Sequence, residues 1–143
     1  MAAPLAVAAV AVADRDRARV VARDADGDVV AALDLPADGR FALDYVHSYY
    51  RAPAQERFTT AGDRFRLESI ASRRAAVLDY YELEGRRVRD GGRLRLYPRE
   101  RRRYERLPLI ATKQGRRTLV AGERRLPLYG RGARHLTIDV ERR

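Results

Sequence analysis

Apolar residues occupy every second position in several stretches of the chain, and polar residues fill most positions between them. Successive side chains of a β-strand point to opposite faces, so this alternation predicts strands with one buried and one solvated face. The clearest stretches are 41–45, 64–68, 93–96 and 136–141.

Glycine-containing turn signals separate these stretches. Asp26-Gly27 lies between the apolar stretches 18–22 and 29–35 and is typical of a short hairpin turn. Short strands at this spacing predict an all-β fold, either a single antiparallel β-sandwich or a partly closed barrel. Further turn signals are Ala37-Asp38-Gly39, Ala61-Gly62-Asp63, Asp90-Gly91-Gly92 and Ala121-Gly122-Glu123.

Residues 64–84 contain no glycine or proline and fit two patterns. Ala75 and Ala76 favour a helix, whereas the valine and tyrosines that follow them favour a strand. We expect two strands here, and a short helix within 66–84 is the alternative.

The chain of 143 residues has the length of one domain, which we place at 14–143. Residues 1–13 are apolar and uncharged, and a bilayer span needs about 20 residues. They fit the remnant of an export or anchor segment, although the positively charged n-region of such a segment is missing. A first strand is the alternative. The predicted core consists of Phe41, Leu43, Phe58, Phe65, Leu67, Leu94, Leu96, Leu119, Leu136, Ile138 and Val140.

The composition excludes several kinds of functional site. There is no cysteine, which excludes disulfides, thiolate metal sites and cysteine nucleophiles, and there are only two histidines. The chain contains no glycine-rich phosphate-binding motif and no nucleophile elbow. Ser48 follows His47 directly, and neighbours on a strand diverge, so the two do not form a nucleophile–base pair there. We therefore expect no metal, no cofactor and no catalytic residues.

Basic residues are concentrated in the second half of the chain. Residues 1–85 hold 11 basic and 14 acidic side chains, whereas 86–143 hold 19 basic and 6 acidic ones. This asymmetry indicates either a basic face for nucleic acid, anionic lipid or an acidic partner, or a solvated arginine-rich surface. The candidate polyanion-binding residues are Arg99, Arg101, Arg102, Arg103, Tyr104 and Arg106.

The densest polar cluster lies within residues 41–58. A hairpin in this segment whose register places Tyr45 opposite Phe58 would also place His47 opposite Glu56, with Cβ atoms about 5 Å apart. Three interpretations of such a pair remain open. His47 is a structural residue bonded to Glu56 or to the loop backbone, or the pair binds a ligand, or it supports catalysis.

The same segment resembles a known family. Its F-x-L-x-Y-x-H-S run, followed by Pro53, Glu56 and Phe58, is similar to domain of unknown function 1850, a family of small bacterial and archaeal proteins. Members are commonly encoded beside TRAP transporter genes of the TAXI type. The chain lacks the glycine-rich stretch that the family carries after its next strand, because residues 69–82 contain no glycine. By resemblance, the candidate ligand-binding residues are Tyr45, His47, Ser48, Pro53 and Glu56.

The resemblance implies a non-enzymatic accessory or binding module, exported or membrane-associated, with a protein partner such as a transporter subunit. A cytoplasmic nucleic-acid-binding β-barrel that uses the basic half of the chain is the first alternative. A ligand-binding or hydrolytic site at His47 and Glu56 is the second.

Overall fold

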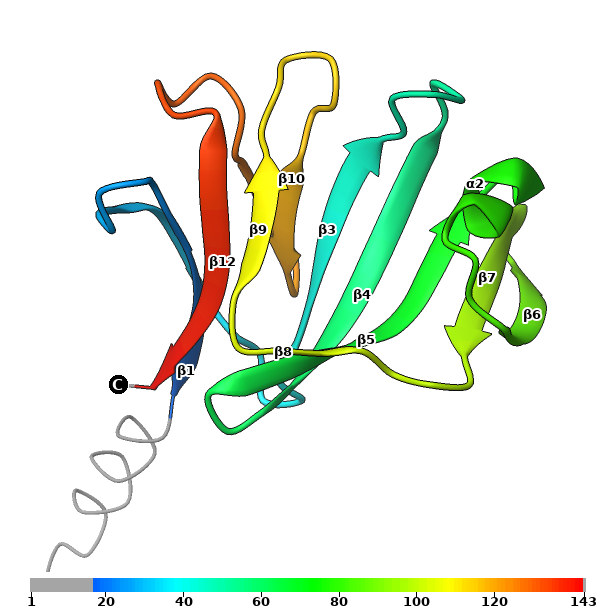
Figure 1. Cartoon of the computed structure of the whole chain (residues 1–143). Coiled ribbons are helices and arrows are strands. Elements are labelled where there is room, and N and C mark those ends of the chain that lie inside the picture. The colour runs from blue at the N-terminus through cyan, green and yellow to red at the C-terminus, as the bar shows by residue number, and fades with distance from the viewer. Residues whose placement is uncertain (1–16, 143) are drawn as a thin grey trace, which may run out of the picture.

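The computed structural model describes residues 17–142, which form two antiparallel sheets around a shared core (Figure 1). The smaller sheet runs in the order β2 (Val29–Asp34), β1 (Ala18–Arg23), β12 (His135–Arg142) and β9 (Leu107–Ile110). The larger sheet runs in the order β11 (Arg124–Pro127), β10 (Thr118–Ala121), β3 (Arg40–Val46), β4 (Pro53–Ala61), β5 (Arg64–Ser72), β7 (Arg93–Pro98) and β6 (Gly85–Asp90), with β8 (Arg103–Tyr104) paired to β5. The prediction of an all-β sandwich is confirmed, and the sheets do not close into a barrel.

The core is built on the alternation seen in the sequence. The rings of Phe41 and Phe58 stack at 5.1 Å between centroids, and Phe65 meets both edge-on at 5.3 and 5.5 Å. The smaller sheet covers this cluster with Leu136 and other apolar residues of β1 and β12. The predicted core residues are all buried except Leu94, which is half-buried on β7.

Each predicted turn joins two strands that are consecutive in the chain. Asp26-Gly27 closes the β1–β2 hairpin, where Gly27 has a φ of 88°, a conformation that side chains with a Cβ rarely adopt. The glycine turns after Ala61, Asp90 and Ala121 likewise connect strands that pair antiparallel.

The segment 64–84 holds one strand and one helix, so the expectation of two strands is wrong. After β5 the Ser72 hydroxyl donates to the Pro53 carbonyl at 2.9 Å and accepts from the backbone N–H of Arg74, which turns the chain off the sheet. The six-residue helix α2 (Ala75–Tyr80) follows and buries Val77 and Leu78. Burial of these two side chains on one helical turn outweighs the strand preference of the aromatic residues.

The apolar segment 1–13 lies outside the described residues. Within 17–142, no helix has the length and apolar character needed to cross a membrane.

Candidate functional site

The hairpin of β3 and β4 has a different register from the predicted one. Leu43 lies opposite Glu56, where His47 was expected, and Tyr45 lies opposite Ala54. The predicted cross-strand pair of His47 and Glu56 is therefore wrong.

A short loop sets this register. Val46 is the last residue of β3 and pairs with Pro53. The backbone N–H of His47 donates to the Ala52 carbonyl at 2.8 Å, and that of Arg51 donates to the His47 carbonyl at 2.7 Å. Arg51 adopts a φ of 50° to close the loop. The turn is thus confined to residues 48–51.

Glu56 lies on the apolar, inward face of the larger sheet. It shares this face with Ala54 and Phe58, two positions away on either side, and both of these are buried. A carboxyl group on such a face needs polar neighbours, because its charged form loses hydration there.

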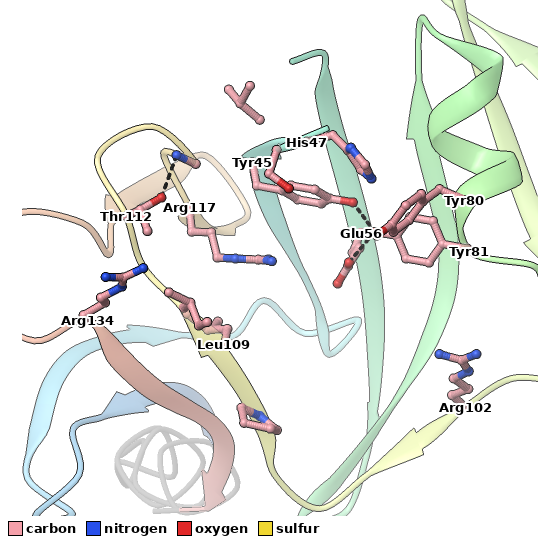
Figure 2. Close-up of a pocket in the computed structure, with 15 residues that line it drawn as sticks. Tyr45, His47, Glu56, Tyr80, Tyr81, Arg102, Leu109, Thr112, Arg117 and Arg134 are labelled. Atoms are coloured by element: carbon pink, nitrogen blue, oxygen red, sulfur yellow. Dashed lines mark hydrogen bonds between the residues drawn. The ribbon is translucent and has the colours of Figure 1, made fainter. Parts of the chain in front are cut away.

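A cavity of about 690 Å³ opens beside Glu56, between the larger sheet and β9 of the smaller one (Figure 2). We call it the inner cavity. Its walls come from β3, β4 and the loop between them, from the end of α2 and from β9. The segment before β8, the loop between β9 and β10 and the loop before β12 complete them. The lining residues are Tyr45, Val46, His47, Ser48, Glu56, Tyr80, Tyr81, Arg102, Pro108, Leu109, Ile110, Thr112, Gly115, Arg117 and Arg134.

Three side chains in the inner cavity form a hydrogen-bonded chain, drawn as dashed lines in Figure 2. The Tyr81 hydroxyl, just after α2, donates to Oε1 of Glu56 at 2.5 Å. The hydroxyls of Tyr81 and Tyr45 also bond to each other. Since Tyr81 donates to the carboxylate, the Tyr45 hydroxyl is the donor in the second bond.

Burial shifts the acidity of all three groups. It raises the pKa of Glu56, although the Tyr81 hydrogen bond and the charges of Arg117 and Arg102 offset part of the rise. Burial and the charge of Glu56 raise the pKa of Tyr45 to about 12 and also raise that of Tyr81. Both tyrosines therefore stay neutral, and Glu56 holds its proton to a higher pH than an exposed carboxyl group does.

Three arginines line the inner cavity. The guanidinium of Arg117 lies over the Tyr45 ring, 4.7 Å from its centroid, and Figure 2 shows it reaching toward Glu56. Arg102 and Arg134 line other parts of the inner cavity. Within residues 17–142 none of the three forms an ion pair, and Glu56 is the one acid among the lining residues. The inner cavity is therefore electropositive.

The opposite wall of the inner cavity is apolar. Pro108, Leu109 and Ile110 of β9 form it, and Ile110 is 47% exposed. An apolar wall facing a few polar groups is the usual composition of a small-molecule site.

His47 holds the hairpin loop. The side chain is buried, and Nδ1 accepts a hydrogen bond from the backbone N–H of Tyr50 at 3.3 Å. Its ring also meets the Tyr80 ring edge-on at 4.7 Å. Burial lowers the pKa of His47, so the neutral imidazole is favoured near pH 7. This geometry matches the interpretation of His47 as a structural residue bonded to the loop backbone.

The other candidate residues divide between different surfaces. Ser48 is exposed at the rim of the inner cavity, whereas Pro53 lines a groove on the opposite face of the sheet. Of the candidate polyanion-binding residues, only Arg102 lines the inner cavity. The Tyr104 ring stacks on Phe65 at 5.6 Å, so that face is not free to stack a base. Arg99, Arg101, Arg103 and Arg106 are exposed.

The sequence reasoning missed Tyr81, Arg117 and Arg134. No local pattern marks them, because each comes from a different connection in the chain. The one available signal was the spacing of Glu56 from Phe58, which places an acid at an inward position of a strand.

Comparison with known proteins does not place the chain in a family. No family model, no curated protein and no solved structure matches it. The resemblance to domain of unknown function 1850 stays a prediction, so the geometry of the site carries the functional proposal.

Proposed function

We propose that the chain is a binding module whose inner cavity holds a small organic anion with an apolar body. The observation that carries this proposal is the combination of three unpaired arginines, within the described residues, with one carboxyl group whose pKa is raised. A cluster of positive charge without a counterion in a concave site favours an anionic ligand.

Arg117 is the principal contact in this proposal. Its guanidinium is already held against the Tyr45 ring, so little side-chain freedom is lost when a carboxylate binds to it. Guanidinium and carboxylate groups match in shape and form paired hydrogen bonds. The apolar body of the ligand packs against Leu109 and Ile110 across the inner cavity.

Glu56 makes this binding depend on pH. In its neutral form the carboxyl group donates a hydrogen bond to the anion, whereas its charged form repels the anion. Because burial favours the neutral form, binding weakens as the pH rises through the raised pKa of Glu56.

The test is ligand-observed NMR with hexanoate, benzoate and phenylacetate as probes and with their primary amides as neutral controls. We expect at least one acid to bind and its amide to bind more than about tenfold more weakly. Arg117→Gln should abolish the difference, whereas Arg99→Gln, which removes the same charge from an exposed loop, should keep it. Equal binding of acid and amide contradicts the proposal, as does equal weakening by both variants.

An accessory role beside a transporter, as the resemblance implies, is consistent with a module that binds a small anion. The proposed partner is then a protein, such as a transporter subunit, that binds the module when the module carries its anion. A pull-down of the tagged chain from its native host, with and without the best acid probe, tests this role. Recovery of the same proteins in both samples counts against a ligand-dependent partner.

A further inference from the structure

A second hollow lies on the opposite, outward face of the larger sheet and has a volume of about 610 Å³. We call it the outer groove. Gln55 lines it and Glu56 lines the inner cavity, and these consecutive residues of β4 point to opposite faces. The two sites are therefore separated by the thickness of the sheet.

The floor of the outer groove is a fixed polar network. Gln55 donates from Nε2 to Asp44 at 2.8 Å, and its Oε1 accepts from Nη2 of Arg95 at 3.3 Å. Asp44 also pairs with Arg125 at 2.8 Å. Both ends of the Gln55 amide are thus held, and the one acid among the described lining residues is already engaged.

Two arginines line the outer groove next to the paired ends of β5 and β7. Arg73 directly follows β5 and Arg93 begins β7, and the adjoining residues Ser72 and Leu94 pair with each other. Like charges on neighbouring strands repel each other. Arg116 approaches the outer groove from the loop before β10.

Among residues 17–142, no acid forms a salt bridge with these arginines. Asp90 lies opposite Arg93 in the β6–β7 pair, but its carboxylate accepts from Nε of Arg95 at 2.8 Å. Within residues 17–142, neither Arg73, Arg93 nor Arg116 forms an ion pair. The rim of the outer groove therefore carries three arginines without a salt-bridge partner among these residues, and the nearby charge of Asp90 acts on Arg93 alone.

We propose that the outer groove binds the phosphate group of a small phosphorylated compound, held between Arg73 and Arg93. A phosphate dianion offers enough oxygens to accept from two guanidinium groups at once and removes the repulsion between them. Arg116 contacts the same anion or the next group of the ligand. The outer groove has the volume of a small-molecule site, which favours a single compound over a long polymer.

The test is isothermal titration calorimetry with pyrophosphate as the probe, at about 0.15 M salt to suppress non-specific attraction. The native chain is compared with the double variant Arg73→Gln/Arg93→Gln. The matched control is Arg99→Gln/Arg101→Gln, which removes two charges from exposed positions outside the outer groove. Unfolding midpoints of all three proteins establish that the variants are folded.

We expect saturable binding to the native chain and to the control, and binding at least about tenfold weaker in the groove variant. Arg117→Gln in the inner cavity should leave pyrophosphate binding unchanged, which keeps this result separate from the test of organic acids. Equal weakening by both double variants would overturn the proposal, because attraction to the net charge would then explain binding. Absence of saturable binding, or binding of a single-stranded oligonucleotide without binding of pyrophosphate, would overturn it as well.

Discussion

Two charged side chains lie on opposite faces of the larger sheet, and they differ in how fully their neighbours satisfy them. Arg95, on the outward face, is 1% exposed and donates from all three of its nitrogens. The acceptors are Asp90 at 2.8 Å, Ser69 at 2.9 Å and Gln55 at 3.3 Å. Glu56, on the inward face, accepts from Tyr81 through one oxygen and lies beside the inner cavity (Figure 2).

This difference distinguishes a fully satisfied structural charge from the carboxyl group on which the proposed binding site rests. Buried polar groups in stable proteins are satisfied by hydrogen bonds, as Arg95 is. A carboxyl group with one hydrogen bond, a raised pKa and a cavity beside it is typical of a binding or catalytic site. We therefore assign Arg95 to the stability of the sheet, whereas Glu56 is the residue proposed for ligand binding.

The largest effect is expected for Arg95→Ala. The substitution leaves Ser69 and Gln55 without a donor and removes a fully packed side chain, so the free energy of unfolding should fall by about 3 kcal/mol. Denaturant unfolding measures this change. The control Arg99→Ala, at an exposed position, should change it by less than about 0.5 kcal/mol. Equal costs for the two variants would show that Arg95 is not a structural charge.

Tyr81→Phe should have the next largest effect. It removes the hydroxyl that donates to Glu56 and accepts from Tyr45, so the free energy of unfolding should fall by about 2 kcal/mol where Glu56 is charged. The loss should be smaller in acid, where Glu56 is neutral. The exposed Tyr49 provides the control, since Tyr49→Phe should have no measurable effect. A loss that does not depend on pH would argue against a bond to the charged carboxylate.

Glu56→Gln should stabilise the protein. Because the pKa of Glu56 is raised in the folded state, folding favours its protonated form, and native stability falls as the pH rises from 4.5 through the raised value. The substituted amide would remain neutral throughout and keep an oxygen that accepts from the Tyr81 hydroxyl. The gain should be on the order of 1 kcal/mol in mildly alkaline buffer and should disappear below pH 4.5. Thermal unfolding across pH measures it, with Glu105→Gln as an exposed control, and a loss of stability in alkaline buffer would be the contrary result.

Asp90→Asn should have the smallest effect. Its hydrogen bond and ion pair with Arg95 hold the pKa of Asp90 below its ordinary value of 3.8. The stabilisation from this charge is present above pH 3.8 and is lost as the pH falls through the lowered pKa. In the variant, the free energy of unfolding should therefore change slightly less with pH below 3.8, and it should be almost unchanged at neutral pH. If Asp90→Asn destabilised the protein as much as Arg95→Ala does, the bond to Asp90, and not those to Ser69 and Gln55, would be the main stabilising contact of Arg95.

Most strand positions and their faces followed from the sequence, whereas the end of the segment 64–84 and the pairing at the hairpin end did not. Glu56 shares a face with Phe58 in the predicted and in the observed register, because the two residues lie two positions apart on the same strand. The neighbour of Glu56 changed from His47 to Leu43, since the alternation pattern carries no information on loop length. Correct faces with an incorrect pairing are the expected outcome of an argument from periodicity alone.

The chemistry of both faces depended on contacts between distant segments. Arg95 belongs to an alternating stretch, so its outward position was predictable, but its burial depends on Gln55 and Ser69 from other strands. Tyr81 reaches Glu56 only because α2 replaces the expected second strand. Arg117 enters the inner cavity from a connection that no local pattern marks.

The most direct test of the central claim is a carbon-13 NMR titration of the Glu56 side-chain carboxyl group in the native protein and in Arg117→Gln. We predict a pKa above 4.5 in the native protein and a further rise in the variant, because the positive charge of Arg117 lowers it. A native pKa at or below 4.5, raised above that value by the variant, would contradict the account. In that case Glu56 would be the charged partner of Arg117, and the inner cavity would lose the unpaired arginine on which the proposed anion site depends.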